Sequence, residues 1–201
     1  MTRRVRVRAF GKINLDLRVL HRRADGYHEI RTVLQTISLA DTIDIAFTRS
    51  RETAVSVEST IADTLMTRAA HAALEEMKLT ARVEMKLRKA IPVGGGLGGG
   101  SSDAAAVLRA LPALARRKIP PDRLHALAAT IGSDVPFFLI GGTAAGFGRG
   151  ELIYPLPDGP RRWVLVVAPG IEVSTAEAYR ALDRGPEPRP VDARTHINDF
   201  E

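Results

Sequence analysis

The feature that most constrains this chain is a glycine-rich stretch between two regularly patterned segments. Residues 91–111 read IPVGGGLGGGSSDAAAVLRAL, and they place six of the chain's 17 glycines in seven consecutive positions. Ordering so many glycines costs conformational entropy, so the fold must gain something at this point. The alternating pattern of ARVEMKLRK before the glycines indicates a strand, and DAAAVLRAL after them favours a helix. A strand that leads through glycines into a helix predicts a loop that binds phosphate.

The physical reason lies in the backbone. Without Cβ atoms the chain can approach an anion and turn several N–H groups toward it. A helix that begins at Ser101 or Ser102, either of which is a natural N-cap, adds unpaired N–H groups and the positive end of its dipole. A Walker A loop would need a lysine before the serine, and a dinucleotide fingerprint would need a βαβ unit. A flexible linker is disfavoured because patterned elements adjoin both sides.

The rest of the pattern predicts an α+β fold rather than a regular βαβ series. Alternation over 3–19, the turn signal Asp25-Gly26 and the apolar stretches 30–39 and 40–47 predict strands. The period changes to a helical one from residue 62. Pro112 is expected to end or kink the helix that follows the glycines. Three further expectations are a helix over 121–131 that stops at Gly132, buried strands at FFLIGG and WVLVVAPG, and a helix capped by Ser174 and Glu177.

Composition and charge narrow the classes of function. The 201 residues, 45% hydrophobic and without cysteine, suit one sizeable domain, or a domain plus part of another, and exclude a disulfide scaffold. With no secretory or membrane-spanning pattern, we expect a cytoplasmic protein. The net charge of +6 suits a polyanionic partner, although an arginine-rich composition explains it equally well. The aromatic content of 5% favours a nucleotide over a nucleic acid.

PVGGGLGGGSSDAA resembles the phosphate loop of the GHMP kinases. GKINLDLRVLHRRADGYHEIRTVLQTISLADTI and GSDVPFFLIGGTAAGFGRGE are similar to one branch, which phosphorylates 4-diphosphocytidyl-2-C-methyl-D-erythritol in the non-mevalonate isoprenoid pathway. The resemblance implies a GHMP kinase N-terminal ATP-binding domain, with a ribosomal-protein-like α+β fold, over residues 1–160. Residues 161–201 would begin a C-terminal α+β domain. Family members continue for about a third more chain, with another glycine motif, so we expect this chain to be C-terminally incomplete.

The resemblance also implies two catalytic residues. Asp134 matches the family's catalytic aspartate, which accepts the proton of the substrate's 2-hydroxyl. Lys12 matches the lysine that orients this aspartate and stabilises charge on the transferred group. From the residues alone, a helix cap is the favoured interpretation of Asp134, and Lys12 can be a solvated strand residue.

The same comparison implies a substrate-binding set around the cytosine ring and the erythritol. Tyr27 would stack on the ring, and His28 would hydrogen-bond the base, as a neutral imidazole can. Without the family, these two residues read as ordinary flanks of a hairpin. The matched substrate-binding positions are Asn14, Tyr27, His28, Thr175 and Tyr179.

For ATP, the resemblance implies that the glycine loop wraps the triphosphate and that Lys89 lies toward the adenine. The cofactor-binding residues would be Lys89, Pro92, Val93, Gly94, Gly95, Gly96, Leu97, Gly98, Gly99, Gly100, Ser101 and Ser102. Mg²⁺ would bridge the phosphates and contact Ser101 or Ser102, with no carboxylate assigned to it. Thr64 stands where the family usually has asparagine, so the adenine contacts are expected to differ.

Two alternatives stay open. The first is that the chain is a different GHMP kinase, which phosphorylates another small molecule. Its N-terminal fold also resembles domains of ribosomal and translation proteins, which allows a truncated, inactive nucleotide- or RNA-binding module. We expect a small-molecule substrate, no nucleic acid, no membrane, and a monomer or weak dimer.

Overall fold

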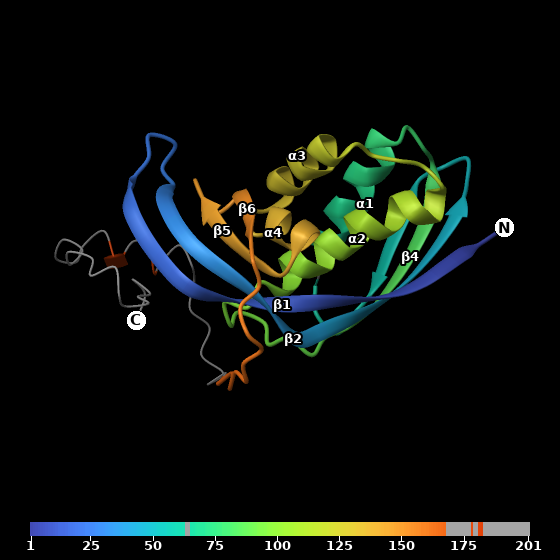
Figure 1. Cartoon of the computed structure of the whole chain (residues 1–201). Helices are drawn as coiled ribbons and strands as arrows, with labels where there is room; N and C mark the ends of the chain where they lie inside the picture. The colour runs from blue at the N-terminus through green and yellow to red at the C-terminus, as the bar shows by residue number, and fades with distance from the viewer. Residues whose placement is uncertain (63–64, 168–177, 179–180, 183–201) are drawn as a thin grey trace.

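The computed structural model describes residues 1–62, 65–167, 178 and 181–182. A six-stranded sheet lies along one side of the molecule, and four helices cover one of its faces (Figure 1). The strands are β1 Arg3–Arg22, β2 His28–Arg49, β3 Ala54–Glu58, β4 Ala81–Arg88, β5 Thr143–Phe147 and β6 Leu152–Leu156. The helices are α1 Leu65–Glu76, α2 Gly99–Ala115, α3 Pro121–Ile131 and α4 Val135–Ile140. The α+β class predicted from the pattern is confirmed.

The two long strands β1 and β2 form the framework of the sheet. They pair antiparallel along almost their whole length, and β2 pairs with β4 and β5 on its other side. The predicted Asp25-Gly26 turn joins them, with Gly26 at a φ of 84° and the N–H of Tyr27 donating to Asp25 Oδ1 at 3.1 Å. The two apolar stretches at 30–39 and 40–47 are parts of the single strand β2, not two strands.

The core lies between this sheet and helices α1 and α2. The residues of β4 alternate between buried and exposed, as the pattern predicts. The buried stripe of α1 is the one expected from its helical period: Met66, Ala69, Ala70, Ala73 and Leu74. These small and medium side chains let the two helices pack closely on Ile43 and Ile45 of β2, which are fully buried.

The segment FFLIGG was predicted to be a strand. Instead, it forms most of the short helix α4. Pro136 lies in the first turn of α4, where a helix loses no hydrogen bond to proline, and this favours the helical conformation. The expectation for Pro112 was also wrong in part: α2 continues past it and ends at Ala115. Leu111 and Leu114 are buried on either side of Pro112, and their packing holds the last turn.

WVLVVAPG was expected to be a buried strand. The structure describes residues 163–167 of this segment, and they contradict the expectation. Residues 161–167 form no regular element, and the side chains of Trp163 and Leu165 are 103% and 89% exposed. No described strand pairs with them, so the backbone gains no ladder. Of the helix predicted after Ser174, the structure describes only residues 178 and 181–182, which are helical, and the domain boundary near residue 160 stays a prediction. Within the described ranges, no helix has the length and apolar character needed to span a bilayer.

Candidate functional site

The glycine loop connects β4 to α2 and is fastened to β1. Leu97 is buried, and its carbonyl accepts the N–H of Lys12 at 2.9 Å. Residues 93–96 are exposed, so their backbone faces solvent. The loop therefore has a fixed inner side and an accessible outer side, as a phosphate loop requires.

The helix after the loop begins earlier than predicted. α2 starts at Gly99, preceded by Gly98 in the left-handed conformation, so Ser101 and Ser102 lie inside the helix and neither is its N-cap. Glycine replaces a capping side chain here because only glycine adopts this conformation without strain. Ser102 is the first residue whose N–H bonds back into the turn, to Gly98 O at 2.9 Å. The N–H groups of residues 99–101 therefore remain for a ligand.

The two serines differ in what they contact. Ser102 is buried, and its hydroxyl donates to the carbonyl of Phe10 at 2.7 Å, so it ties α2 to β1. Ser101 is half-buried, and its hydroxyl lies beside Gly132, near the start of the turn that carries Asp134. Of the two predicted serines, Ser101 is the one whose hydroxyl is left for a ligand.

Lys12, Asn14 and Asp134 lie together beside the loop. The side chain of Lys12 is buried, and its Nζ donates to Asn14 Oδ1 at 2.6 Å and lies 3.9 Å from Asp134 Oδ2. Lys12 is therefore not the solvated strand residue of the alternative interpretation. Asp134 precedes α4 but forms no capping hydrogen bond within the described structure, and its side chain is 39% exposed. Its carboxylate is thus held by a lysine on one side and open to solvent on the other.

A turn between β5 and β6 links this cluster to the tip of the β1–β2 hairpin. Gly148 accepts the N–H of Ile30 at 2.8 Å and donates to Glu29 at 3.0 Å. The guanidinium of Arg149 lies 4.8 Å from the centre of the Tyr27 ring, which is exposed. A Cβ on Gly150 would lie 4.0 Å from Asp134 Oδ1. The sequence analysis missed this turn, although its alternating glycines in GFGRG were a signal.

His28 is half-buried at the first residue of β2, next to Tyr27. Thr64, Thr175 and Tyr179 lie outside the described residues.

Lys89 is surrounded by carboxylates of the protein. Its Nζ donates to Asp41 Oδ2 and, at 3.0 Å, to Asp103 Oδ2. Burial by itself would lower the pKa of Lys89, but the hydrogen bonds and charges of Asp41 and Asp103 outweigh burial and raise it above its ordinary value. Both aspartates were missed from the sequence, since Asp41 and Lys89 are far apart along the chain and only the antiparallel pairing of β2 with β4 brings them together.

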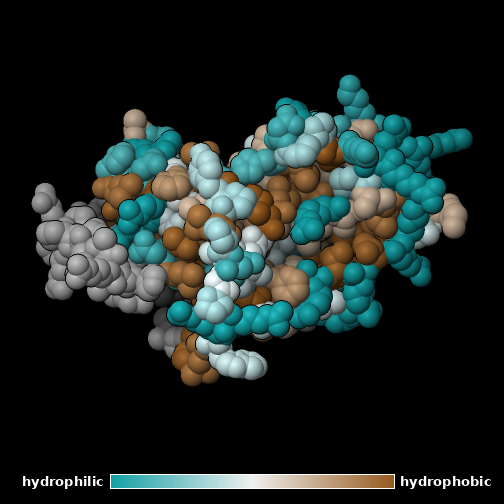
Figure 2. Space-filling view, viewed as in Figure 1, coloured by the Kyte–Doolittle hydropathy of each residue, from teal (hydrophilic) through white to brown (hydrophobic). Residues whose placement is uncertain are grey.

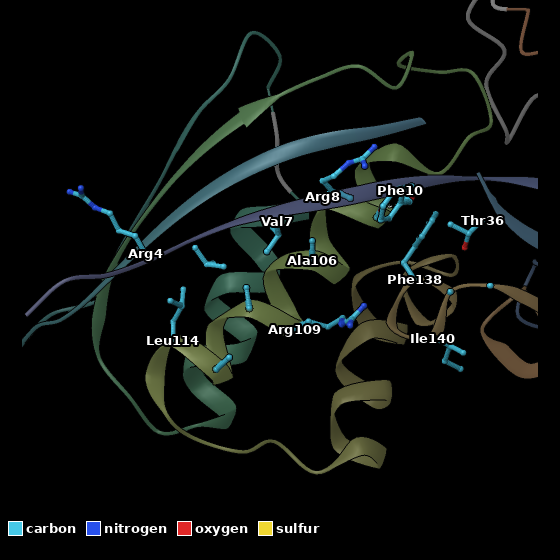
Figure 3. Close-up of a pocket in the computed structure, with 17 residues that line it drawn as sticks. Arg4, Val7, Arg8, Phe10, Thr36, Ala106, Arg109, Leu114, Phe138 and Ile140 are labelled. Atoms are coloured by element: carbon cyan, nitrogen blue, oxygen red, sulfur yellow. Dashed lines mark hydrogen bonds between the residues drawn. The ribbon is translucent and has the colours of Figure 1, made fainter. Parts of the chain in front are cut away.

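A separate groove lies between β1 and α2 and does not include Lys12, Asn14 or Asp134 (Figure 3). Its volume is about 850 Å³, and Val7, Ala106 and Leu114 form part of its apolar wall. Figure 2 shows hydrophobic side chains between the hydrophilic stripe of β1 and the helices. Among the residues that the structure describes, no cluster of three or more histidine, aspartate or glutamate side chains is arranged to hold a metal ion.

Comparison with known proteins identifies relatives. The family model for the GHMP kinases N terminal domain matches residues 64–142. The chain is 57% identical over 185 residues to a 4-diphosphocytidyl-2-C-methyl-D-erythritol kinase of Solibacter usitatus, covering 91% of this chain and 58% of that protein. With the protein of that name from Pelotomaculum thermopropionicum it is 42% identical over 193 residues, covering 94% and 67%.

A solved structure is similar over most of the chain. The crystal structure of a 4-(cytidine 5'-diphospho)-2C-methyl-D-erythritol kinase superposes with a TM-score of 0.73 at 38% identity, covering 89% of this chain and 64% of that one. The chain thus spans about three fifths to two thirds of the length of the relatives it matches.

Proposed function

The chain belongs to the 4-diphosphocytidyl-2-C-methyl-D-erythritol kinase family of the GHMP kinases, and we propose that it transfers the γ-phosphoryl group of ATP to the 2-hydroxyl of that substrate. The observation that carries the proposal is the convergence of three parts of the chain. The glycine loop is bonded to β1 at Lys12, and the Lys12 ammonium lies beside the Asp134 carboxylate. A phosphate site and a proton acceptor therefore adjoin each other.

The loop and the first turn of α2 would bind the triphosphate. The N–H groups of residues 99–101 precede the first intrahelical bond, and the positive end of the helix dipole favours an anion at this point. ATP would enter as its magnesium complex, because Mg²⁺ is commonly held by phosphate oxygens together with few protein ligands. Ser101, near the start of α2, would offer its hydroxyl to that complex.

Asp134 would accept the proton of the attacking hydroxyl. The hydroxyl oxygen forms the new bond to the γ-phosphorus, the bond from this phosphorus to the oxygen retained by ADP breaks, and the proton moves to the carboxylate. Lys12 holds its ammonium at the same place through Asn14, so its charge would stabilise the negative charge on the transferred group. The partial exposure of Asp134 leaves the approach that an acceptor needs.

The hairpin tip would bind the cytosine. The exposed face of Tyr27 is available for stacking, and His28 adjoins it on β2. Glu29 and Gly148 fasten this tip to the turn that reaches Asp134, so the base and the reacting hydroxyl would be held by one connected unit. Thr175 and Tyr179 remain further candidates from the sequence resemblance.

The proposal is tested by ADP release from magnesium-ATP and the cytidine-diphosphate-linked substrate, with other GHMP kinase substrates as a panel. We expect turnover that requires this substrate and collapses in Asp134→Asn. Asp122→Asn is the matched control, because Asp122 lies on the exposed first turn of α3 and loses the same charge. Equal turnover in Asp134→Asn would contradict the proposal, and so would silence both of this chain and of a chain extended past Glu201.

A further inference from the structure

We propose that Asp41 is a positioning residue of the glycine loop, which fixes the point where β4 gives way to the loop and thereby orients the loop for its anion. Asp41 lies on β2, and its side chain is 0% exposed. It takes no part in the phosphate transfer proposed above and would act through the backbone and through Lys89.

One oxygen of Asp41 holds the backbone at the entrance to the loop. Its Oδ1 accepts the N–H of Ala90 at 2.6 Å and the N–H of Ile91 at 2.9 Å. These two residues follow the last residue of β4, Arg88, by two and three positions, so they have left the ladder with β2. A carboxylate that accepts two consecutive N–H groups replaces the ladder and determines the direction in which the chain leaves the strand.

The other oxygen of Asp41 is joined through Lys89 to the helix behind the loop. The Lys89 ammonium bonds Asp41 Oδ2 and Asp103 Oδ2, and Asp103 lies in α2, where it is 1% exposed. The lysine therefore connects the entrance of the loop on the β4 side to its exit on the α2 side. A Cβ on Gly99 would lie 3.0 Å from Lys89 Nζ, so the ammonium sits directly under the first residue of the helix.

The carboxylate of Asp41 has two kinds of partner, which explains why an aspartate is needed at this position. Asp41 and Asp103 share the Lys89 ammonium through their Oδ2 atoms, and the N–H groups of Ala90 and Ile91 point at Asp41 Oδ1. An asparagine at position 41 keeps an oxygen that can accept both N–H groups, but it turns the amide donors of its own side chain toward Lys89. Truncation to alanine removes every contact. The proposal thus predicts a graded loss, with asparagine intermediate and alanine complete.

Amide hydrogen exchange tests the proposal without any ligand. In the unmodified chain, the N–H groups of Ala90 and Ile91 are expected to exchange at least 100-fold more slowly than those of Gly94–Gly96. In Asp41→Asn we expect exchange of the Ala90 and Ile91 N–H groups to rise about tenfold or more, while the amides of β4 and α1 keep their protection. Equal exchange in the variant, or a uniform rise over the whole core, would overturn the proposal, because a uniform rise is what a purely structural residue gives.

Asp103→Asn supplies the second variant if Asp41→Asn does not fold. It removes one partner of Lys89 but leaves the bonds of Asp41 to Ala90 and Ile91, so these two amides should stay protected. Loss of their protection in Asp103→Asn would contradict the assignment of the clamp to Asp41. Fast exchange of these amides in the unmodified chain would contradict it as well.

The consequence for the anion rests on the proposed function and is tested with a fluorescent ATP analogue. The dissociation constant is expected to rise about tenfold in Asp41→Asn and further in Asp41→Ala, at a temperature where each variant is folded. Asp44→Asn is the control, because Asp44 lies on the same strand and pairs only at the surface with Arg6 and Arg88. No binding by the unmodified chain would overturn the proposed function and leave hydrogen exchange to decide on Asp41, whereas equal binding by Asp41→Asn would overturn the positioning role.

Discussion

The Nζ of Lys12 lies 3.9 Å from Oδ2 of Asp134 and 2.6 Å from Oδ1 of Asn14, although the lysine comes from the first strand and the aspartate from the turn before α4. The shorter contact fixes the ammonium, and the longer one leaves the carboxylate free to turn toward a substrate. Thr32 supports Asn14 in turn, by accepting its amide N–H at 2.7 Å. The cluster is therefore anchored in the β1–β2 pair rather than in a loop.

Replacement of Lys12 tests the electrostatic part of the mechanism. We expect Lys12→Met to lower kcat about 100-fold or more, since removal of one preorganised charge from a phosphoryl-transfer site costs about this much. Lys12→Arg should not restore activity, because the Lys12 side chain is buried and its Nζ already lies 2.6 Å from Asn14 Oδ1, which leaves little space for the larger guanidinium. Steady-state kinetics with both substrates saturating gives the measurement. Retention of kcat in Lys12→Met would contradict the role.

Two glycines of the loop offer a matched pair of substitutions. Gly96 and Gly98 have almost equal φ values, 68° and 67°, so alanine is strained by about 1–2 kcal/mol at either position. At Gly98 the added Cβ would also lie 2.8 Å from the ring of Phe138, whereas at Gly96 no described atom lies within 4 Å. We expect Gly98→Ala to cost a further 1–3 kcal/mol or so, as overpacking does. Urea unfolding of both variants measures the difference, and equal losses would contradict it.

Local sequence chemistry predicted much of the fold because the responsible forces are local. The alternation of Val83, Met85 and Leu87 and the turn at Asp25-Gly26 need no distant partner to be recognised. FFLIGG failed for the opposite reason. Its apolar run suits a buried strand and a buried helix equally, and only the packing of Phe137 and Phe138 under α2 decides between them.

The residues of the candidate site also differ in whether a local pattern in the sequence could reveal them. The glycine loop is a contiguous pattern, and Lys12 and Asp134 were found through the resemblance to a family. Asp41 was not found, because its partners Ala90 and Ile91 are joined to it only by the fold, and nothing in ADTI marks its aspartate as buried. Ser102 reads the same as Ser101 in the sequence. Only the early start of α2 turns Ser102 inward toward Phe10.

The raised pKa of Lys89 predicts how stability changes in alkali. Because its pKa in the folded state lies above the ordinary value of 10.5, the stabilisation by Lys89 is fully present below that pH and is lost as the pH rises through the folded pKa. Lys89→Met leaves Asp41 and Asp103 buried without a countercharge, which costs about 3–5 kcal/mol near neutral pH. We therefore expect the stability gap between the unmodified chain and this variant to narrow above pH 10.5. Urea midpoints from pH 7 upward measure it.

Lys86→Met provides the control for that experiment, because Lys86 lies on the same strand and pairs with Glu58 at the surface. Its effect on stability should be within about 1 kcal/mol. A gap for Lys89→Met that stayed constant with pH would show that the ammonium does not compensate the two carboxylates.

The exposed segment after β6 makes a prediction that needs no ligand. Trp163 is the chain's one tryptophan and has a fully exposed side chain, and Leu165 and Val167 beside it are 89% and 76% exposed. We expect indole emission close to that of a free indole in water, full access to iodide, and little change of emission when urea unfolds the protein. Emission shifted to the blue, and returning to the red on unfolding, would mean that something covers this segment.

The same apolar side chains predict self-association. Contiguous exposed apolar surface drives association unless a partner covers it. The apparent mass of the unmodified chain, measured by light scattering, should therefore rise with concentration. Leu165→Ser combined with Val167→Ser removes apolar area without touching the sheet, and we expect it to raise the concentration at which scattering begins while the urea midpoint stays unchanged. Leu74→Ser, by contrast, removes a buried side chain of α1. It should lower the free energy of unfolding by about 2–5 kcal/mol, and the urea midpoint with it. If the double variant associates as readily as the unmodified chain, the groove between β1 and α2 becomes the surface to test next, through Val7→Ser.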